Sequence, residues 1–404
     1  MHSFPRISVQ NMSDISSSSG KRLKLRDVIV LSGWNWQTFN VPERMALAFA
    51  KLRAKVLYCE NPVSRLRHRG RPLGEIEAGI YGWGPEFLGH RINRIPFGSR
   101  LQAKFLADRI AKQACVLKLE DPIVVCPHGQ WFGPLCTELK KKNFPLVHIC
   151  MDYPESGQEK LIELSDLTLV IPKSVFYQLN AKYGDKIVSI PQVTQMSESE
   201  VIASAARNDS NVDEFPEIPR PRLGYLGPVT NRLNTQLLAQ VLSSRPDWHF
   251  LHFGADKCLP IANVHAIPWR EAKNLGEVIA KLDVGFMPYD CYDNKNFHCT
   301  PLKLFDYFSK GIPVVSTPIV NLWEFAETVY FGHDADELCR AVQLALDEPK
   351  DSPKRCNRLR IARDHSIDAL AAALSEQSDA MRILGGVKEC GAEAGSGGRG
   401  TVKR

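Results

Sequence analysis

Short runs of β-branched and other apolar residues recur along the chain and alternate with helix-length amphipathic stretches. In the first half these runs lie at 27–32, 55–59, 122–126, 146–150 and 167–171. The alternation predicts a parallel sheet flanked by helices. A polar, acidic stretch at 197–221, closed by three prolines, interrupts it. Such a composition is typical of an interdomain linker.

The same alternation restarts after this stretch and predicts a second doubly wound α/β domain. Its apolar runs lie at 222–227, 248–254, 263–267, 283–288 and 312–316. We therefore expect a disordered tail, two domains with a linker between them, a C-terminal helix that returns to the first domain, and a second disordered tail. The tails are 1–26 and 386–404, and the domains are 27–200 and 222–350. The linker is 201–221, and the returning helix is 351–385.

Length and composition agree with two folded domains. A chain of 404 residues is longer than a single domain usually is. Its 44% hydrophobic and 24% charged residues are typical of folded proteins. No apolar run approaches the length that crosses a bilayer, and the N-terminus lacks a signal-peptide stretch. We expect a cytoplasmic protein. The eleven cysteines occur singly, without metal-ligand spacing, which is typical of reduced thiols.

Positive charge is concentrated in the segment from Arg65 to Arg71. Such a cluster can bring a protein to an anionic membrane or an anionic acceptor, which would make it peripheral at the inner membrane face. A solvated loop is the simpler alternative, because most charge runs are exposed.

The stretch 298–317 carries the densest set of local signals. Thr300 is a suitable N-cap, Pro301 suits the first helical position, and Gly311 provides a stop before the next strand. With this cap, the backbone N–H groups of Leu302 and Lys303 have no partner within the helix. The pattern therefore predicts a diphosphate site at the start of helix 301–310.

Two charged side chains of this helix extend the prediction. Lys303 adds a full positive charge near the diphosphate, and Asp306, three residues later, can accept hydrogen bonds from ribose hydroxyls. We expect both on one face, with the apolar residues anchoring the opposite arc. The alternative is an ordinary ion pair on a surface helix.

A glycine turn after the first strand of the second domain adds two candidates. Gly227 would let the backbone approach a ligand, and Arg232 could clamp phosphate oxygens with its guanidinium. Arg232 as a solvated helix residue is the alternative.

In the first domain, candidates follow the predicted strands, where open α/β sheets place their ligands. Gly33 and Trp34 follow strand 27–32 and are assigned to the acceptor side; the alternative is simple packing. His128 and Asp152 follow strands 122–126 and 146–150, and both are candidate catalytic residues. The alternative for each is a local hydrogen bond or cap.

The chain lacks the sequence motifs of kinases and of dinucleotide-dependent dehydrogenases. There is no Walker A sequence, and the glycines at 79–84 have the wrong spacing for a dinucleotide fingerprint. No carboxylate cluster suggests a metal site. We expect no metal and no cofactor beyond a nucleotide diphosphate sugar as donor substrate, and no nucleic acid partner.

At these residues the chain resembles the GT-B glycosyltransferases, specifically the large retaining group, families 4 and 1, of the bacterial cell-surface polysaccharide type. Five ordered segments carry the resemblance: GYLGPV, PDWHFLHFG, NVHAIPW, LDVGFMPY and TPLKLFDYFSKGIPVVST. It implies an α/β GT-B fold with two Rossmann-like domains facing a cleft, of which 27–200 lies on the acceptor side and 222–350 binds the nucleotide sugar. It also implies transfer of a sugar, with retention, to a glycan, lipid or small-molecule acceptor in polysaccharide biosynthesis.

The resemblance assigns roles within a Glu-x7-Glu pattern. Asp306 stands at the second Glu, which holds the donor ribose, whereas His298 replaces the first. This departure keeps two alternatives open: a nucleotide-sugar epimerase of the same fold, and a catalytically silent nucleotide-sugar-binding protein.

Overall fold

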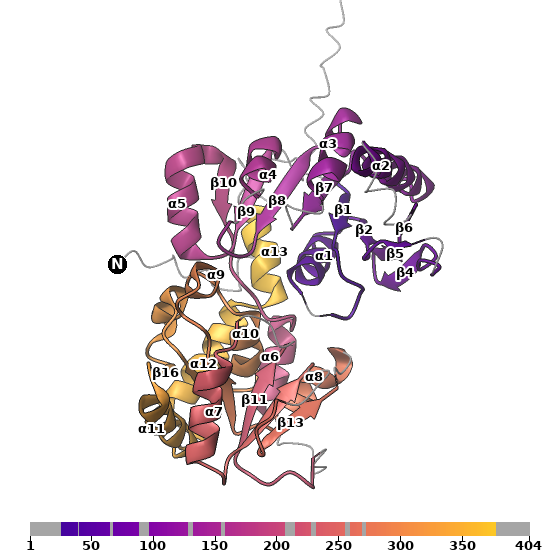
Figure 1. Cartoon of the computed structure of the whole chain (residues 1–404). Coiled ribbons are helices and arrows are strands. Elements are labelled where there is room, and N and C mark those ends of the chain that lie inside the picture. Colours follow the sequence, from indigo (N-terminus) through magenta and orange to yellow (C-terminus); the bar gives the residue numbers. More distant parts are fainter. Residues whose placement is uncertain are drawn as a thin grey trace, which may run out of the picture.

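The chain folds into two α/β domains joined by a short connection and by its C-terminal helices (Figure 1). This computed structural model describes residues 26–38, 40–64, 68–88, 97–127, 132–154, 158–206, 215–227, 232–254, 259–268 and 272–376. Within them, no helix is long and apolar enough to span a membrane.

The first domain is built on an eight-stranded sheet of order β10-β9-β8-β7-β1-β2-β5-β4. Its strands are β1 (Val28–Leu31), β2 (Val56–Cys59), β4 (Gly74–Glu77), β5 (Ile80–Trp83), β7 (Ile123–Cys126), β8 (Leu146–Cys150), β9 (Leu167–Val170) and β10 (Ile187–Ser189). All neighbours are parallel except β4 and β5. The five apolar runs of the first half all form strands. The segment 63–87, including the small β3 (Val63–Ser64) and β6 (Glu86–Phe87) pair, was not predicted.

Helices cover both faces of this sheet, which explains why its strands are apolar on both sides. They are α1 (Val41–Lys51), α2 (Gly98–Val116), α3 (Gly133–Lys141), α4 (Gln158–Leu164) and α5 (Lys173–Tyr183), with a 3-10 turn, η3 (Gly184–Lys186). In β1, Val28 and Val30 pack in the cluster that contains α1, while Ile29 and Leu31 pack in the cluster that contains α2 and α3. Burying each such side chain contributes about 1.5–3 kcal/mol.

The second domain contains a parallel six-stranded sheet of order β13-β12-β11-β14-β15-β16. Its strands are β11 (Arg222–Leu226), β12 (His249–Phe253), β13 (Val264–Ile267), β14 (Val284–Met287), β15 (Val314–Ser316) and β16 (Val329–Phe331). Its helices are α7 (Thr235–Ser244), α8 (Ala272–Ile279), α9 (Asn294–Phe297), α10 (Leu302–Phe308), η4 (Val320–Phe325) and α11 (Ala335–Leu346). The two parallel sheets form the α/β architecture expected from the sequence.

Tyr307 fixes α10 on this sheet. Its hydroxyl donates to the Gly224 carbonyl at 2.9 Å and accepts from the Leu226 amide at 3.1 Å. A Cβ on Gly285 would lie 2.6 Å from the Tyr307 ring, so the glycine makes room for the aromatic side chain. The start of α10 is thereby held beside the ends of β11 and β14.

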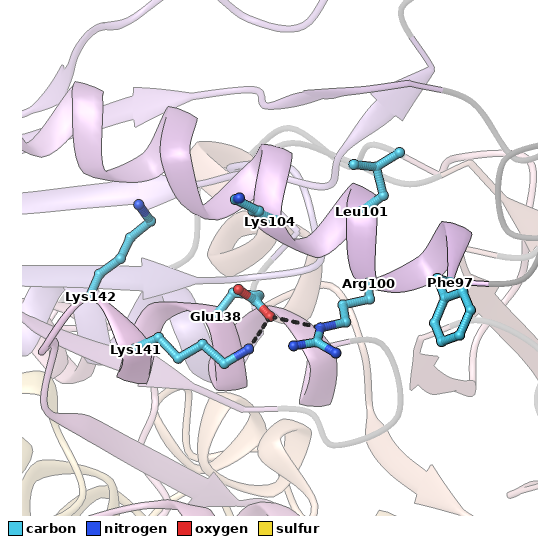
Figure 2. Close-up of a pocket in the computed structure, with 7 residues that line it drawn as sticks. All are labelled: Phe97, Arg100, Leu101, Lys104, Glu138, Lys141 and Lys142. Atoms are coloured by element: carbon cyan, nitrogen blue, oxygen red, sulfur yellow. Dashed lines mark hydrogen bonds and ion pairs between the residues drawn. The ribbon is translucent and has the colours of Figure 1, made fainter.

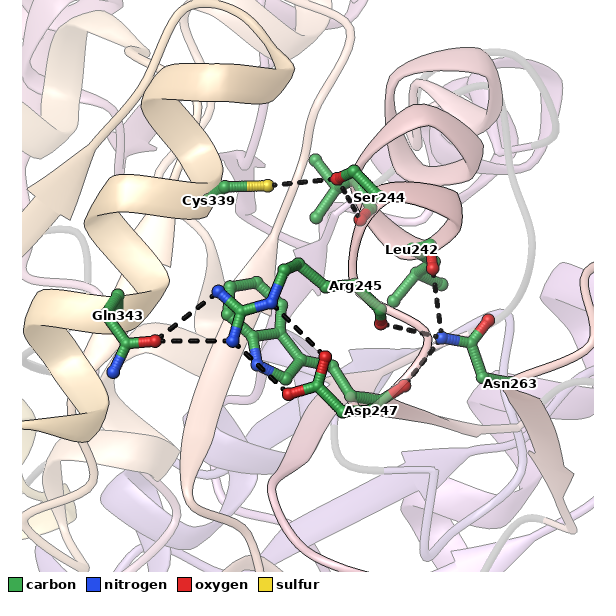
Figure 3. A network of polar contacts seen from close by, with 9 residues as sticks. Leu242, Ser244, Arg245, Asp247, Asn263, Cys339 and Gln343 are labelled. Carbon is green, nitrogen blue, oxygen red and sulfur yellow. Dashed lines mark hydrogen bonds and ion pairs between the residues drawn. The ribbon is translucent and has the colours of Figure 1, made fainter.

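A polar network holds the far end of this domain together (Figure 3). The Arg245 guanidinium lies 4.0 Å from the Trp248 ring centroid and donates to Asp247 and, from α11, Gln343. The Asn263 amide donates to the Trp248 carbonyl at 2.6 Å and also to the last carbonyls of α7. The network satisfies the end of a helix that leads into β12.

The connection between the domains differs from the predicted linker 201–221. Helix α6 (Glu198–Ala206) crosses its start, and Phe215 and Ile218 near its end are buried in the core of the second domain. The Arg222 guanidinium donates to the carbonyls of both residues. Apolar side chains and a buried cation therefore draw the end of this segment into the domain.

Two helices bring the chain back to the first domain. Helix α12 (Pro353–Asp364) lies against α10, and α13 (Ile367–Glu376) packs on α1. Ile367, Leu370 and Leu374 belong to the first domain's core cluster. Asp368 also forms an ion pair with Lys51 at 2.7 Å.

Candidate functional site

Several candidate residues meet where the strand ends of the two domains face each other. Gly227 follows β11, Tyr289 follows β14, and Lys303 lies in the first turn of α10. Asp152 follows β8 of the first domain. Loops at the carboxyl ends of parallel strands are the usual ligand-binding edge of such sheets, so this junction is the candidate site.

Lys303 has an unusual environment for a lysine. Its Nζ lies 3.7 Å from the Tyr225 ring centroid and donates to the Tyr289 hydroxyl at 3.1 Å. Its pKa is lowered to about 7, first by burial and then by the positive charge of Arg232. In the described part of the chain it forms no ion pair with a carboxylate. A desolvated ammonium of this kind is suited to an anionic ligand.

Gly227 lies against this ammonium. Its φ is 129°, and a Cβ there would lie 3.4 Å from Lys303 Nζ. His252 Nε2 donates to the Gly227 carbonyl at 2.9 Å and so fixes the backbone. The structure thus places the Gly227 backbone beside the lysine, and the approach of a ligand to Gly227 stays a prediction.

Arg232 and Asp152 form an ion pair between the domains. One guanidinium nitrogen, NH2, lies 2.9 and 2.8 Å from the two carboxylate oxygens. Burial acts most strongly and would lower the pKa of Arg232, but the charges of Asp152, Cys299 and Tyr289 and the hydrogen bond to Asp152 together raise it. The two candidates are thus brought together, and the alternative of Arg232 as a solvated residue is wrong.

Asp306 contacts a different set of groups from Lys303. Its side chain is 9% exposed, and its carboxylate accepts from Arg44 of α1 at 2.9 Å and from the Thr194 hydroxyl at 2.9 Å. The i,i+3 surface pair offered as the alternative is also wrong, because the helix is buried at the domain junction. No local pattern points to Arg44, because its partner is 262 residues away.

The start of the helix also differs from the prediction. Pro301 is the N-cap and makes no side-chain capping bond, so Thr300 does not cap the helix and Pro301 is not its first residue. The Thr300 carbonyl accepts from the Gln192 amide at 3.1 Å, and Leu302 packs against the first domain's core. Contacts across the junction therefore override the local capping signal.

His298, which the resemblance sets at the first Glu of the Glu-x7-Glu pattern, contacts the first domain. Its Nδ1 lies 2.9 Å from the Ser174 hydroxyl, and its ring stacks on Tyr153 with centroids 5.1 Å apart. Burial lowers its pKa, which favours the neutral imidazole. Asn321 donates to the His298 carbonyl and to Ser174. Sequence reasoning missed Ser174, Tyr153 and Asn321, which carry no motif.

The acceptor-side candidates lie after β1. Gly33 has a φ of 72°, and a Cβ there would lie 3.4 Å from the Phe132 ring. The Trp34 amide donates to the Ser32 hydroxyl at 3.2 Å. Asn40 caps α1 through the Glu43 amide. His128 lies outside the described residues.

The basic segment is only partly free for an external partner. Arg65 and Arg67 lie outside the described residues. Arg71 pairs with the buried Glu60 at 2.9 Å, and a Cβ on Gly70 would collide with the Gly84 carbonyl. His68 and Arg69 are exposed.

Sequence comparison finds known proteins that are similar to parts of this chain. Residues 232–376 match the family described as Glycosyl transferase-like. The chain is 26% identical over 167 residues to a Bacillus subtilis (strain 168) protein named "Putative teichuronic acid biosynthesis glycosyltransferase TuaH". This match spans 37% of the chain and 40% of that relative's length.

Structural comparison extends the likeness to both domains. An E. coli structure described as trehalose-6-phosphate bound with UDP-2-fluoro glucose has a TM-score of 0.63 and 13% identity, over 89% of this chain and 100% of that chain. A UDP-forming trehalose-phosphate synthase from Burkholderia xenovorans has a TM-score of 0.63 and 11% identity, over 88% and 100%. The chain has the GT-B fold, and these findings support a GT-B glycosyltransferase.

Proposed function

We propose that this GT-B chain transfers a sugar from a nucleoside diphosphate sugar to an acceptor held by the first domain. The observation that carries the proposal is the buried position of Lys303, against the Tyr225 ring and the Tyr289 hydroxyl, where burial and the charge of Arg232 lower its pKa. Two partly or fully buried cations, with Lys303 next to the Gly227 backbone, suit a diphosphate.

In the proposed reaction the sugar's C1 develops positive charge while the diphosphate leaves with growing negative charge. Lys303 and Arg232 stabilise that charge. With its pKa near 7, Lys303 is partly neutral in the free protein, and an arriving diphosphate restores its proton. The ammonium of Lys303 therefore attracts the departing nucleoside diphosphate more strongly than the less negative bound donor.

Asp152 has a catalytic role in this scheme. When the diphosphate binds Arg232, it replaces Asp152 as the partner of the guanidinium. The carboxylate then loses its partner and can accept a proton or a hydrogen bond from the acceptor hydroxyl. His128, predicted at the end of the neighbouring strand, remains a second candidate for the same cleft.

Asp306 is proposed to hold the donor ribose through lone pairs that Arg44 and Thr194 leave open, since a carboxylate accepts about four hydrogen bonds. The role rests on the resemblance of its position to the family's second Glu. Thr300 and Leu302 are proposed to contribute backbone contacts to the diphosphate.

The proposal also covers the stereochemistry, the metal dependence, the acceptor and the location of the protein. We expect retention of anomeric configuration, metal independence, and an acceptor in polysaccharide biosynthesis, which the name of the Bacillus subtilis relative supports. Gly33 and Trp34 are assigned to that acceptor. The protein is proposed to be cytoplasmic, with Arg65 to Arg71 contacting the inner membrane face.

A silent donor-binding protein is the second candidate, favoured by one observation. His298 stands where the resemblance expects a carboxylate, and its Nδ1 is engaged by Ser174. Such a protein would bind nucleoside diphosphate sugars without consuming them.

Donor consumption separates these readings. Nucleoside diphosphate release is measured from a panel of nucleoside diphosphate sugars, with and without glycan and lipid acceptors. Transfer predicts release that Lys303→Ala reduces about 10- to 1000-fold in kcat/KM. An epimerase converts the donor without release. A panel in which every donor binds and none reacts would favour the silent protein.

A further inference from the structure

A second basic surface lies on the first domain, away from the junction. Helices α2 and α3 line an open pocket of about 580 Å³. It is lined by Phe97, Arg100, Leu101, Lys104, Glu138, Lys141 and Lys142 (Figure 2). Four of these seven side chains are cationic and one is anionic, so the pocket has a net positive charge.

The single carboxylate in this pocket is already held by cations. Glu138 pairs with Lys141 at 2.6 Å and with Arg100 at 3.6 Å. Its pKa is lowered, first by the hydrogen bond from Lys141 and also by the charges of Arg100 and Lys104. Lys104 forms no ion pair within the described residues, and Lys142 pairs with Asp108 at 2.5 Å. The pocket thus retains positive charge for an external anion.

Apolar side chains stand at the rim of the same pocket. Phe97 is 82% exposed and Leu101, one turn later, is 54% exposed. Phe97 has a φ of 62°, a left-handed conformation that bulky residues rarely adopt. A strained, water-exposed phenylalanine directly before a 19-residue helix indicates a function outside the monomer's core.

We infer that this α2–α3 surface seats on an anionic phospholipid bilayer. Arg100, Lys104, Lys141 and Lys142 complement lipid phosphates, and Phe97 with Leu101 enters the head-group layer. Exposed apolar side chains flanked by cations fit a bilayer surface, which presents both partners together. A free phosphate would use the cations alone.

This surface differs from the segment from Arg65 to Arg71. The described part of that segment, 68–71, lies near Arg109 of α2. Arg109 does not line the pocket and instead contacts Glu86 and the Trp83 ring. The backbone of Gly70 also reaches Glu86 there. The two membrane proposals can therefore be tested by separate variants, and neither depends on glycosyl transfer.

Sedimentation with vesicles tests the inference on the full chain. The vesicles contain phosphatidylcholine alone or a mixture with phosphatidylglycerol, at physiological salt. The chain is expected to bind only the mixture. R100E/K104E and, separately, F97S/L101S are each expected to weaken binding at least about tenfold. Arg69→Glu reports on the other basic segment.

The matched control is R340E/L344S on α11, which removes an exposed cation and an exposed leucine one turn apart in the second domain. It should bind like the parent. Thermal unfolding verifies that each variant is folded, which is expected because all seven substituted positions are exposed. Inorganic phosphate should not compete at millimolar concentration.

Three outcomes would overturn the inference. One is binding that ignores phosphatidylglycerol, and another is binding that the control reduces as much as the α2 variants. The third is a change in oligomeric state with F97S/L101S in the absence of vesicles, which would make this face a contact between copies.

Discussion

The Arg232 guanidinium of the second domain and the Asp152 carboxylate of the first are joined by hydrogen bonds of 2.9 and 2.8 Å. Both side chains lie at the ends of strands that face each other, and both are candidate site residues. In this conformation each satisfies the other. A ligand diphosphate that needs Arg232 must therefore compete with Asp152.

This competition predicts opposite effects for the two partners. Asp152→Asn should tighten nucleoside diphosphate binding about tenfold, because a neutral amide holds Arg232 less strongly, while transfer is lost. Arg232→Ala should weaken binding by about 10- to 100-fold. Calorimetry measures the affinities, and nucleoside diphosphate release measures the turnover. Weakening by both variants would contradict the competition.

The lowered pKa of Lys303 predicts a proton linkage. A diphosphate favours the ammonium, so its binding at pH 8 should take up nearly one proton, whereas binding at pH 6 should take up little because Lys303 is already charged. Calorimetry in buffers of different ionisation enthalpy counts these protons. Lys303→Arg should abolish the uptake. Equal uptake in this variant would place the titrating group elsewhere.

The Arg44–Asp306 pair predicts a stability effect. Its side chains are 2% and 9% exposed, so removing either partner leaves a buried charge alone. Arg44→Met or Asp306→Asn should each lower the free energy of unfolding by about 3–5 kcal/mol, and the double variant by less than their sum. Chemical denaturation measures these values. Additive losses would indicate that the pair is not coupled.

Asp306→Asn also separates the ribose role from this structural one. If Asp306 holds the donor ribose, the variant should discriminate less between ribose and deoxyribose nucleoside diphosphates. Equal discrimination by parent and variant would leave Asp306 with a purely structural role.

The fold was largely predictable because its strands are short apolar runs. The runs at 27–32 and 222–227 became β1 and β11, since both faces of a parallel sheet are buried. The hairpin at Gly74–Trp83 was missed because β4 is mostly exposed and carries charge. The buried end of the linker, Phe215 and Ile218, was missed because prolines and acidic residues surround two apolar side chains.

The site was predictable in part. Lys303 and Gly227 came from helix and turn signals that act over a few residues, and the structure brings them together. The partners of Asp306 and Arg232 come from the other domain, at separations of 262 and 80 residues. Local patterns contain no such information, so Thr300 was assigned a cap that Pro301 occupies.

The central claim is that Lys303 binds the donor diphosphate. The most direct measurement is calorimetry of a nucleoside diphosphate with the parent, Lys303→Ala and Lys354→Ala. Lys354 is a matched control, because its Nζ also lies over a tyrosine ring, at 4.1 Å from Tyr330 in the second domain. The account predicts that Lys303→Ala weakens binding at least about tenfold while Lys354→Ala binds like the parent. Equal affinity in all three proteins would contradict it.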